Sequence, residues 1–529
     1  MRLFRMISGQ GRGFWAQAGG ALAIAGLIAG CGDNYRPTVL PVGSNGPAAQ
    51  PTSYAVVVSS TGSATSDGVV TIIDYSGDTI MTEATIGPGP TAFTLDVTAS
   101  NGYALNSDKT ISNFPISTSL QTKQVSFSSL STASAIVNLT PLSFGLWATD
   151  LNGDVVDLFI GSPQALKATV PVATSASSAT MPMFIAGTPT PNGQREYVLS
   201  QNVPDTAPMT CNLTPTTVGV NGVATPIEIS TGTADPALAL DPYNPSNAPE
   251  GSTNAQCPVF ALQTPDQQRL FVLNRGSDTI SVINTQNNTL DSCTPFQNQN
   301  GQWITCHPSI KLPAGSGPVF AEYNSATQQL IVANYDGGSI SVINTALDEY
   351  GNDANTYTNS NCTTYAACGA PTGGFGTVVT IPVGNTATPN PASVTVLYDG
   401  SKAYTANQND GVQNGTVTVV NLSTYTVEKT ITVVGHPRTV VSTQNSEFAK
   451  VYVASPDSPY ITIIESTPTI IDQIDTTVLV EGLPIDIRTT TPNGSGGNSN
   501  YSSRVPGYGQ PCNLPGSAPL VSLVACQKQ

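Results

Sequence analysis

The chain is poor in charged side chains, and above all in basic ones. Only 10% of its 529 residues are charged, with 18 Lys and Arg against 34 Asp and Glu, which gives a formal net charge of −16 at pH 7. An ordinary soluble domain has about 25% charged residues. Because an acidic surface repels phosphate groups, nucleic acid is excluded as a partner, and so is attachment to anionic lipids by charge alone.

Histidine and the signatures of common enzymes are also scarce. We find no G-x-S-x-G, H-E-x-x-H, P-loop or G-x-G-x-x-G motif. The two histidines are His307, which we interpret as a loop residue, and His436 in "VVGHPRT", which we interpret as a solvent-facing turn residue. No C-x-x-C occurs, and the Asn- and Asp-rich turns at 334–338 and 407–414 lack the full ligand spacing of a calcium site. The sequence therefore predicts no metal and no cofactor, and leans away from an enzyme.

Long amphipathic helical periods are absent after residue 31, and short β patterns take their place. The stretch "QQLIVANYDGGSISVINTA" (328–346) nearly repeats "QRLFVLNRGSDTISVINTQ" (268–286). In each, two apolar, β-branched runs flank a polar gap, and Gly337 and Gly338 in the second stretch suit the positive φ angles of a tight turn. Each stretch therefore predicts a β-hairpin.

The first strand of that hairpin recurs along the whole domain. Most copies follow a short apolar strand and precede a third strand and an outer fourth, and four antiparallel strands per unit make a propeller blade. The sequence predicts an all-β propeller of eight blades, or seven if the region 130–256 hides one irregular unit. The eight copies are "YAVVVSS" (54–60), "YALNSD" (103–108), "FGLWATD" (144–150), "REYVLSQ" (195–201), "RLFVLN" (269–274), "QLIVAN" (329–334), "KAYTAN" (402–407) and "KVYVAS" (450–455).

These repeats resemble the YVTN β-propeller family, whose repeat runs through "YVAN", a D-G-T turn, "VSVID" and an outer strand ending in "PVG". The segments "LIVANYDGGSISVINT", "AYTANQNDGVQNGTVTVVN" and "VVTIPVGN" (378–385) carry the resemblance, which covers about 53–488 and is weak between 130 and 256. It implies the architecture but no activity. Lactonase-like propellers are more distant relatives, which place acidic, basic or metal-binding groups around a central channel.

The two ends of the repeat region predict how the ring closes. The first unit begins with its second strand at Tyr54, whereas the last unit is followed by a spare apolar segment, "LPIDIRT" (483–489). We expect this segment to become the innermost strand of the first blade, with the chain near Ile485 beside the chain near Val57. Such pairing leaves no blade edge open.

The N-terminus has the pattern of a secretory signal over residues 1–30: three arginines, then an uncharged apolar stretch from Ala16 to Gly30. The alternative, a transmembrane helix, needs about 20 apolar residues. The ending "LIAGC" resembles the lipobox of bacterial lipoproteins, which implies that Cys31 becomes the lipid-bearing first residue. Residues 31–52, rich in Pro, Gly and Asn, predict a flexible tether.

This resemblance implies a location at the bacterial cell envelope, with the membrane as partner through the N-terminal lipid. Gly32, in place of Asp, favours the outer membrane in the family's sorting logic, while retention at the inner membrane stays possible because Asp33 is close. Residues 490–529 predict a flexible C-terminal tail with a disulfide loop.

Eight cysteines besides Cys31 are an even number in an exported chain, which is typical of a disulfide framework. Sequence alone does not fix the connectivity. Close spacing in irregular segments suggests three pairs and leaves a fourth: Cys293 with Cys306, Cys362 with Cys368, Cys512 with Cys526, and Cys211 with Cys257.

Long insertions point to binding. Segments 286–308 and 346–376 are predicted to connect a third strand to a fourth, and 202–256 to be a further excursion from the fourth blade. Irregular loops on a rigid ring are typical of surfaces that recognise a protein or glycan, although they are also tolerated simply as surface insertions.

The alternative function is a lactonase-like hydrolase with its site in the central channel. Its candidate residues fall on or beside innermost strands, where they either meet for acid–base chemistry or pair structurally. These candidates are Asp96, Glu322, Arg438, Asp486 and Arg488. The prediction we favour is a lipid-anchored, extracytoplasmic binding or scaffolding module.

Overall fold

A computed structural model describes the propeller region of the chain. The chain divides into residues 1–50, which lie outside the described residues, and residues 51–529. The described residues are 53–490, apart from 97, 132–135, 143–144, 152, 173–179, 188–194, 202–221, 241–256, 292–295, 298–302, 305–308, 348–373, 444–447 and 468–470.

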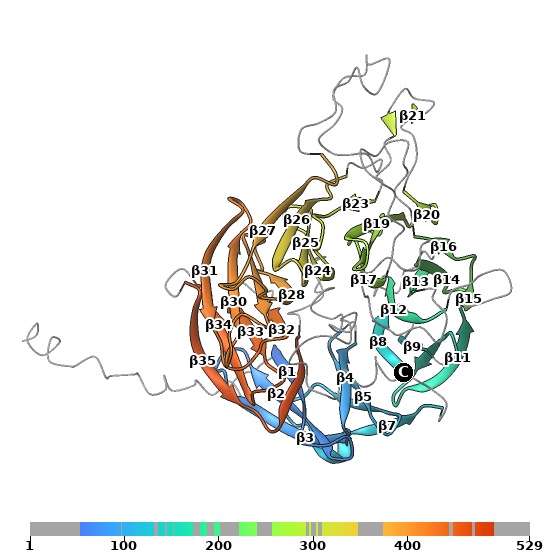
Figure 1. Cartoon of the computed structure of the whole chain (residues 1–529). Coiled ribbons are helices and arrows are strands. Elements are labelled where there is room, and N and C mark those ends of the chain that lie inside the picture. The colour runs from blue at the N-terminus through green and yellow to red at the C-terminus, as the bar shows by residue number, and fades with distance from the viewer. Residues whose placement is uncertain are drawn as a thin grey trace, which may run out of the picture. The chain divides into compact units, whose positions relative to one another are not determined.

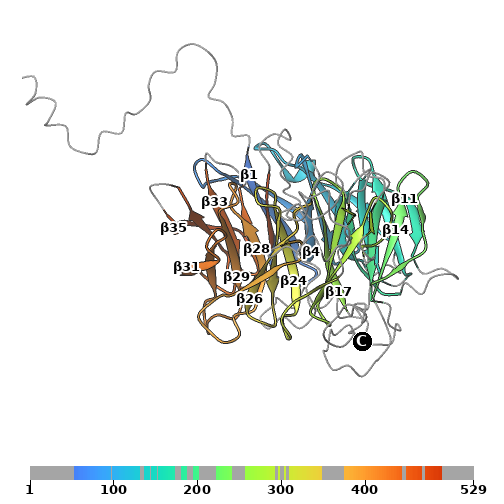
Figure 2. The same ribbon diagram turned by 90° about the horizontal axis from the view of Figure 1, so that it is seen from above.

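Eight β-sheets surround a common axis in the described part of the chain, so the prediction of an all-β, eight-bladed propeller is confirmed (Figure 1). Each sheet is an antiparallel meander, and the blades are numbered 1 to 8 along the chain. The strands cross the thickness of the ring (Figure 2).

The first four blades contain the following strands, in order from the innermost outwards. Blade 1 contains β36 (Leu483–Thr489), β1 (Tyr54–Ser60), β2 (Asp67–Asp74) and β3 (Ile80–Pro88). Blade 2 contains β4 (Pro90–Leu95), β5 (Asn101–Asn106), β6 (Thr110–Pro115) and β7 (Ser126–Ser129), with a 3-10 turn, η1 (Thr122–Gln124), before β7. Blade 3 contains β8 (Ile136–Leu142), β9 (Gly145–Asp150), β10 (Val155–Ile160) and β11 (Ala165–Pro171). Blade 4 contains β12 (Pro182–Gly187), β13 (Arg195–Ser200), β14 (Val223–Glu228) and the short β15 (Thr233–Ala234) and β16 (Leu238–Ala239).

The other four blades follow the same order. Blade 5 contains β17 (Pro258–Gln263), β18 (Arg269–Asn274), β19 (Thr279–Asn284), and β20 (Thr289–Leu290) and β23 (Ile310–Lys311), which both pair with β19. Blade 6 contains β24 (Pro318–Asn324), β25 (Gln329–Asn334), β26 (Ser339–Asn344) and β27 (Val378–Pro382). Blade 7 contains β28 (Pro391–Val396), β29 (Lys402–Asn407), β30 (Thr416–Asn421) and β31 (Thr426–Thr432). Blade 8 contains β32 (Thr439–Ser442), β33 (Lys450–Ala454), β34 (Tyr460–Glu465) and β35 (Gln473–Leu479).

Two insertion predictions need correction. The segment 202–256 is not one excursion, because β14, β15 and β16 lie within it and complete blade 4. The segment 286–308 does not lead from a third strand to a fourth. It interrupts the fourth strand itself, whose two halves are β20 and β23, and it contains a two-stranded ribbon of β21 (Phe296–Gln297) and β22 (Trp303–Ile304). The segment 346–376 does connect the third strand to the fourth of blade 6, as predicted.

The ring closes as the sequence predicts, through pairing of β36 with β1. Val57 lies opposite Ile487 and Val56 opposite Arg488 in an antiparallel ladder. Beyond the ladder, the Tyr54 amide donates to Thr490 Oγ1 at 2.7 Å, and the buried Tyr75 hydroxyl donates to the Thr490 carbonyl at 2.9 Å. The two ends of the described chain therefore complete one sheet.

The apolar core fills the interfaces between blades. Side chains on both faces of the inner strands are buried, and one continuous cluster runs from Leu151 to Leu422, through blades 4 to 7. Smaller clusters lie between the remaining blades. Because each sheet packs on both faces, its strands are near-continuous apolar runs, which explains why "LIVAN" and "SISVIN" recur.

The asparagine that ends the "YVAN"-like strand has a structural role in four blades. In blade 6 the Asn334 amide donates to two hydroxyls of the next strand, Ser339 at 3.0 Å and Ser341 at 2.8 Å. Asn106, Asn274 and Asn407 make the same pair of contacts in their blades. One buried amide thus ties the second strand to the third, so the repeat is a packing rule.

The turns define two faces of the ring. Turns between first and second strands, and between third and fourth strands, lie on one face, because the strands alternate in direction. Tyr54, where β1 begins, pairs with Asp74, where β2 ends and the turn to the fourth strand of blade 1 begins. Residue 53 therefore enters the ring on this face. We call it the tether-side face and the other the opposite face.

Candidate functional site

The innermost strands share a register that places one residue of each blade at an equivalent position near the axis. Six of these strands have a β-bulge between their first and third described positions, as between Pro258 and Phe260. Proline lacks an amide hydrogen, so it suits a bulge at a strand start. We call the residue after the bulge, or its counterpart in blades 1 and 8, the inner position. Blades 1 to 8 place there, in order, Asp486, Ala92, Asn138, Phe184, Phe260, Phe320, Ser393 and Thr439.

We call blades 4 to 6 the aromatic half of this ring and blades 7, 8 and 1 its polar half, and blades 2 and 3, with Ala92 and Asn138 at the inner position, belong to neither. The Phe184 and Phe260 ring centroids lie 5.1 Å apart, and those of Phe260 and Phe320 lie 4.9 Å apart. All three side chains are buried. Their spacing is that of favourable aromatic pairs, so this half is held by apolar packing.

Blades 7, 8 and 1 form a polar half. The Ser393 hydroxyl donates to the Arg438 carbonyl at 2.8 Å and accepts the Val440 amide at 3.1 Å. The Thr439 hydroxyl donates to Asp486 Oδ1 at 3.1 Å. Hydrogen bonds therefore connect β28 to β32 and β32 to β36.

Two of the five candidate residues meet directly. The Arg488 guanidinium donates to Asp486 Oδ2, and both side chains are buried. They lie two residues apart on β36 and so share one face of the strand. Removing either partner alone would leave a buried charge uncompensated, so the two side chains depend on each other within the closing strand.

The remaining three candidates have different surroundings. Asp96 accepts hydrogen bonds from the Thr98 and Ser100 amides and from the Asn101 side chain, so it organises the turn between β4 and β5. Glu322 is buried on β24. Arg438 is buried beside β32. Burial raises the pKa of Tyr335 in blade 6, and the positive charges of Arg275 and, to a smaller extent, Arg438 oppose that rise. Strand β36 therefore places Asp486 and Arg488 together, whereas the hydrogen bonds of the Asp96 side chain stay within its own turn.

Oxygen atoms in the two Asn- and Asp-rich turns are engaged within the protein. Asp336 forms a two-point ion pair with Arg275, at 2.8 and 2.7 Å. Asp410 accepts the Asn385 and Thr386 amides and the Thr416 hydroxyl. Within the described ranges, no group of three or more His, Cys, Asp or Glu side chains is placed to hold a metal ion.

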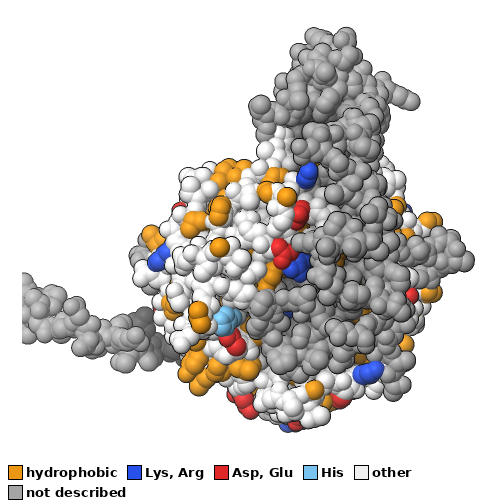
Figure 3. Space-filling view, viewed as in Figure 1, with side chains coloured by type: hydrophobic (Ala, Val, Ile, Leu, Met, Phe, Trp, Pro, Cys, Tyr) orange, Lys and Arg blue, Asp and Glu red, His pale blue; other side chains and the backbone are white. Residues whose placement is uncertain are grey.

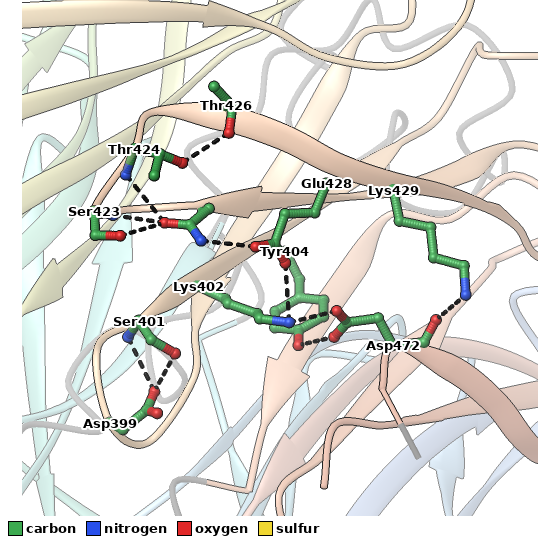
Figure 4. A network of polar contacts seen from close by, with 11 residues as sticks. Asp399, Ser401, Lys402, Tyr404, Ser423, Thr424, Thr426, Glu428, Lys429 and Asp472 are labelled. Atoms are coloured by element: carbon green, nitrogen blue, oxygen red, sulfur yellow. Dashed lines mark hydrogen bonds and ion pairs between the residues drawn. The ribbon is translucent and has the colours of Figure 1, made fainter. Parts of the chain in front are cut away.

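Sequence reasoning missed an ionic cluster between blades 7 and 8 (Figure 4). Lys402 Nζ lies 2.5 Å from Asp472 Oδ2 and 3.0 Å from Glu428 Oε2, and the Tyr404 hydroxyl donates to Asp472 Oδ1 at 2.6 Å. Asn421 also donates to Glu428, at 2.7 Å. The Asn421 bond and Lys402 lower the pKa of Glu428. Burial lowers the pKa of Lys402, but its two acidic partners raise it by more, so the net shift is upward.

The same arrangement recurs between blades 8 and 1. Lys450 Nζ lies 2.6 Å from Asp78 Oδ2 and donates to the Tyr75 carbonyl at 2.9 Å, and Tyr452 donates to Asp78 at 3.3 Å. A visible signal existed, since β29 and β33 both begin Lys-x-Tyr. The acidic partners gave none, because they lie 70 and 372 residues away from their lysines.

Most of the predicted loop and lipid residues lie outside the described part of the chain, including Cys31 and His307. Cys257 is described and is disulfide-bonded. The other seven cysteines that we predicted to form disulfides lie outside the described residues, so the connectivity stays a prediction. His436 is in the turn before β32, where its Nδ1 lies 2.5 Å from Asp457 Oδ2 and its amide donates to Asp457 Oδ1. No helix among the described residues is long and apolar enough to cross a membrane.

Three solved structures are similar to this chain, and the likeness to the first of them supports the fold. The dihydro-heme d1 dehydrogenase NirN is similar at a TM-score of 0.53 and 12% identity, covering 85% of this chain and 78% of that one. AztD from Citrobacter koseri has a TM-score of 0.49 at 12% identity, with 84% and 99% covered. A putative 6-phosphogluconolactonase from Bacteroides fragilis has a TM-score of 0.45 at 14% identity, with 84% and 99% covered.

At these identities the likeness concerns the fold alone. No protein-family model matches the chain, and no curated protein matches it. The class that the fold and the site define is an eight-bladed β-propeller.

Proposed function

We propose that this chain is a YVTN-type, lipid-anchored β-propeller that acts as a binding or scaffolding module at the bacterial cell envelope. The observation that carries the binding role is that the charged side chains of the closing strand are engaged in contacts within the protein. Asp486 and Arg488 are buried and paired, and Thr439 hydrogen-bonds Asp486, so these groups hold the ring together. A rigid ring with insertions at blades 4, 5 and 6 is suited to recognition by loops.

The repeat chemistry supports the family part of the proposal. Asn106, Asn274, Asn334 and Asn407 each bridge to two hydroxyls of the following strand. The pattern therefore specifies how strands pack, and it leaves the loops free to differ between members of such a family.

Labelling with radioactive palmitate tests the anchor. Cells expressing the full chain are expected to incorporate label into this protein, and the Cys31→Ala variant is expected to incorporate none. Density-gradient separation of the membranes should place the wild-type protein with the outer membrane. Equal labelling of both forms, or recovery of the wild-type protein with soluble material only, would refute the lipid anchor.

Capture of partners from detergent-solubilised envelope tests the binding role. The full chain is compared with a variant in which residues 348–373 are replaced by a short Gly-Ser linker, and with a matched variant in which residues 202–221 are replaced in the same way. Circular dichroism and thermal melting establish that each is folded. We expect loss of specific partners from the first variant, and equal recovery from all three forms would contradict recognition by that loop.

A further inference from the structure

We infer that the tether-side face of blades 7, 8 and 1 rests against a lipid bilayer, so that the anchored propeller has a fixed orientation on the membrane. This inference rests on the proposed lipid anchor and goes beyond it, because an anchor with a flexible tether does not by itself orient a domain. We call the six exposed apolar side chains of this region the bilayer-facing patch. They are Ile80, Tyr398, Tyr425, Val427, Ile471 and Ile474.

The patch belongs to turns and strand ends of one face. Tyr398 lies in the turn between the first and second strands of blade 7, and Tyr425 in the turn between its third and fourth strands. Ile471 and Ile474 occupy the corresponding turn and the start of β35 in blade 8, and Ile80 begins β3 in blade 1. Their exposed fractions are 37% to 56%, so they are held out of the core. Aliphatic and tyrosine side chains of this kind partition favourably into the headgroup region of a bilayer.

The chain enters the ring beside this patch. Ser53 precedes β1 on the tether-side face, and Tyr54 and Tyr75 fix that entry by their bonds to Thr490. A relaxed tether of about twenty residues spans roughly 25 Å, comparable to the thickness of the ring at about 3.3 Å per strand residue. The tether-side face therefore reaches the membrane without the tether passing around the ring. Anchoring also keeps a weakly binding patch at high effective concentration near the lipid.

Charges around the patch are largely paired within the protein. Lys402 lies between Asp472 and Glu428, and Lys429 Nζ donates to the Asp472 carbonyl at 2.7 Å (Figure 4). Lys450 pairs with Asp78 at the next interface. Internal pairing reduces the cost of placing this surface against a medium of low dielectric constant. The exposed acids that remain, Asp399 and Asp475, favour zwitterionic over anionic lipid.

The opposite face of the same blades provides a comparison. It also has exposed apolar side chains, among them Val434, Tyr460, Leu479 and Leu483, and Tyr460 lies directly across from Leu479. Figure 3 shows patches of apolar side chains on one face of the described part of the ring. The exposed acids Asp67, Asp457 and Glu481 also lie on it, and the chain does not enter there.

Strand β35 supplies a matched pair of positions for the test, because Ile474 and Leu479 lie at its two ends and are 40% and 57% exposed. The variants Ile474→Trp and Leu479→Trp are prepared as lipidated full-length proteins in phosphatidylcholine vesicles containing brominated lipid, which quenches indole fluorescence on contact. Wild-type protein gives the background of the native tryptophans. We expect quenching of Ile474→Trp at least about twofold greater than that of Leu479→Trp.

Equal quenching of the two variants, or stronger quenching of Leu479→Trp, would overturn the inference. A second outcome would also overturn it: the fluorescence of Ile474→Trp is not quenched by the brominated lipid, and the indole becomes shielded from aqueous iodide only when envelope extract is added. The patch would then bind a protein and not the bilayer. Replacing part of the phosphatidylcholine with phosphatidylglycerol should weaken the quenching, and stronger quenching there would contradict the charge argument.

A second measurement separates this inference from the anchor. The Cys31→Ala protein, which has no lipid, is sedimented with an excess of phosphatidylcholine vesicles. Adding Ile471→Ser and Ile474→Ser should reduce the bound fraction several-fold, whereas Val434→Ser with Leu479→Ser should not. If palmitate labelling succeeds but neither measurement distinguishes the faces, the orientation is wrong and the anchor stands. If labelling fails, the anchor is wrong whatever the vesicles show.

Discussion

The two halves of the ring close the same backbone geometry with different chemistry. At the inner position, blades 4 to 6 carry three phenylalanines whose rings contact one another at a tilt. Blades 7, 8 and 1 carry Ser393, Thr439 and Asp486, whose side chains form hydrogen bonds between the inner strands. Interfaces of the polar half are also held by Lys402 and Lys450 with their acidic partners. The strand register fixes the inner position in each blade, and different combinations of side chains can pack or hydrogen-bond there. The difference predicts that the two groups of blades are weakened by different kinds of substitution.

The largest effect should come from the centre of the aromatic half. Phe260→Ala removes a fully buried ring that contacts two neighbours, and such truncations cost about 3–5 kcal/mol. The midpoint of chemical denaturation should fall accordingly. Phe260→Leu is the control and should cost less, because it keeps most of the volume. Equal losses would mean that aromatic packing does not stabilise this half.

Breaking the buried ion pair of the polar half should cost nearly as much. Arg488→Met leaves Asp486 charged and buried without its partner, which costs about 3 kcal/mol. The double variant Arg488→Met with Asp486→Asn should recover most of this loss, because the uncompensated charge is gone. The same denaturation curves measure both, and failure of the second change to restore stability would refute pairing as the cause.

A smaller loss should follow removal of one hydroxyl in the polar half. Ser393→Ala leaves the Arg438 carbonyl and the Val440 amide without their partner at the inner position, at a cost of about 1–2 kcal/mol. Blade 2 has Ala92 at the equivalent position, so the smaller side chain fits the backbone there. The reverse change, Ala92→Ser, should bring no matching gain in melting temperature.

The smallest effect is the pH response of the cluster in Figure 4. Because Asn421 and Lys402 lower the pKa of Glu428, its stabilising contribution is complete above pH 4.5 and is lost as pH falls through the lower folded-state value. Lys402 has a raised pKa, so its contribution is present below pH 10.5 and is lost as pH rises through the higher folded-state value. Glu428→Gln should therefore flatten the acid limb of a stability profile, and an unchanged limb would contradict this assignment.

The sequence predicts the repeated strands well because each apolar run alternates with turn residues at a regular period. "LIVAN" and "KVYVA" become β25 and β33, and "LPIDIRT" becomes the closing strand. Blade 4 is harder to predict, because β14 contains Pro226 and its outer strands have two residues each. Segments that short carry no measurable period.

The candidate site is predicted less completely. Asp486 and Arg488 are found from sequence because "LPIDIRT" is predicted to be an innermost strand. The burial of this pair depends on the whole ring, and the pairing of Lys450 with Asp78 joins two segments 372 residues apart. A single sequence does not encode such contacts in any local pattern.

Closure by β36 also orders events during biogenesis. The first strand to be synthesised, β1, lacks its inner neighbour until the segment around Ile487 has been made, about four hundred residues later. Blade 1 is therefore the last sheet to be completed. A chain truncated before residue 483 would expose an unpaired inner edge, and the product would be prone to aggregation and proteolysis in place of being a shortened propeller.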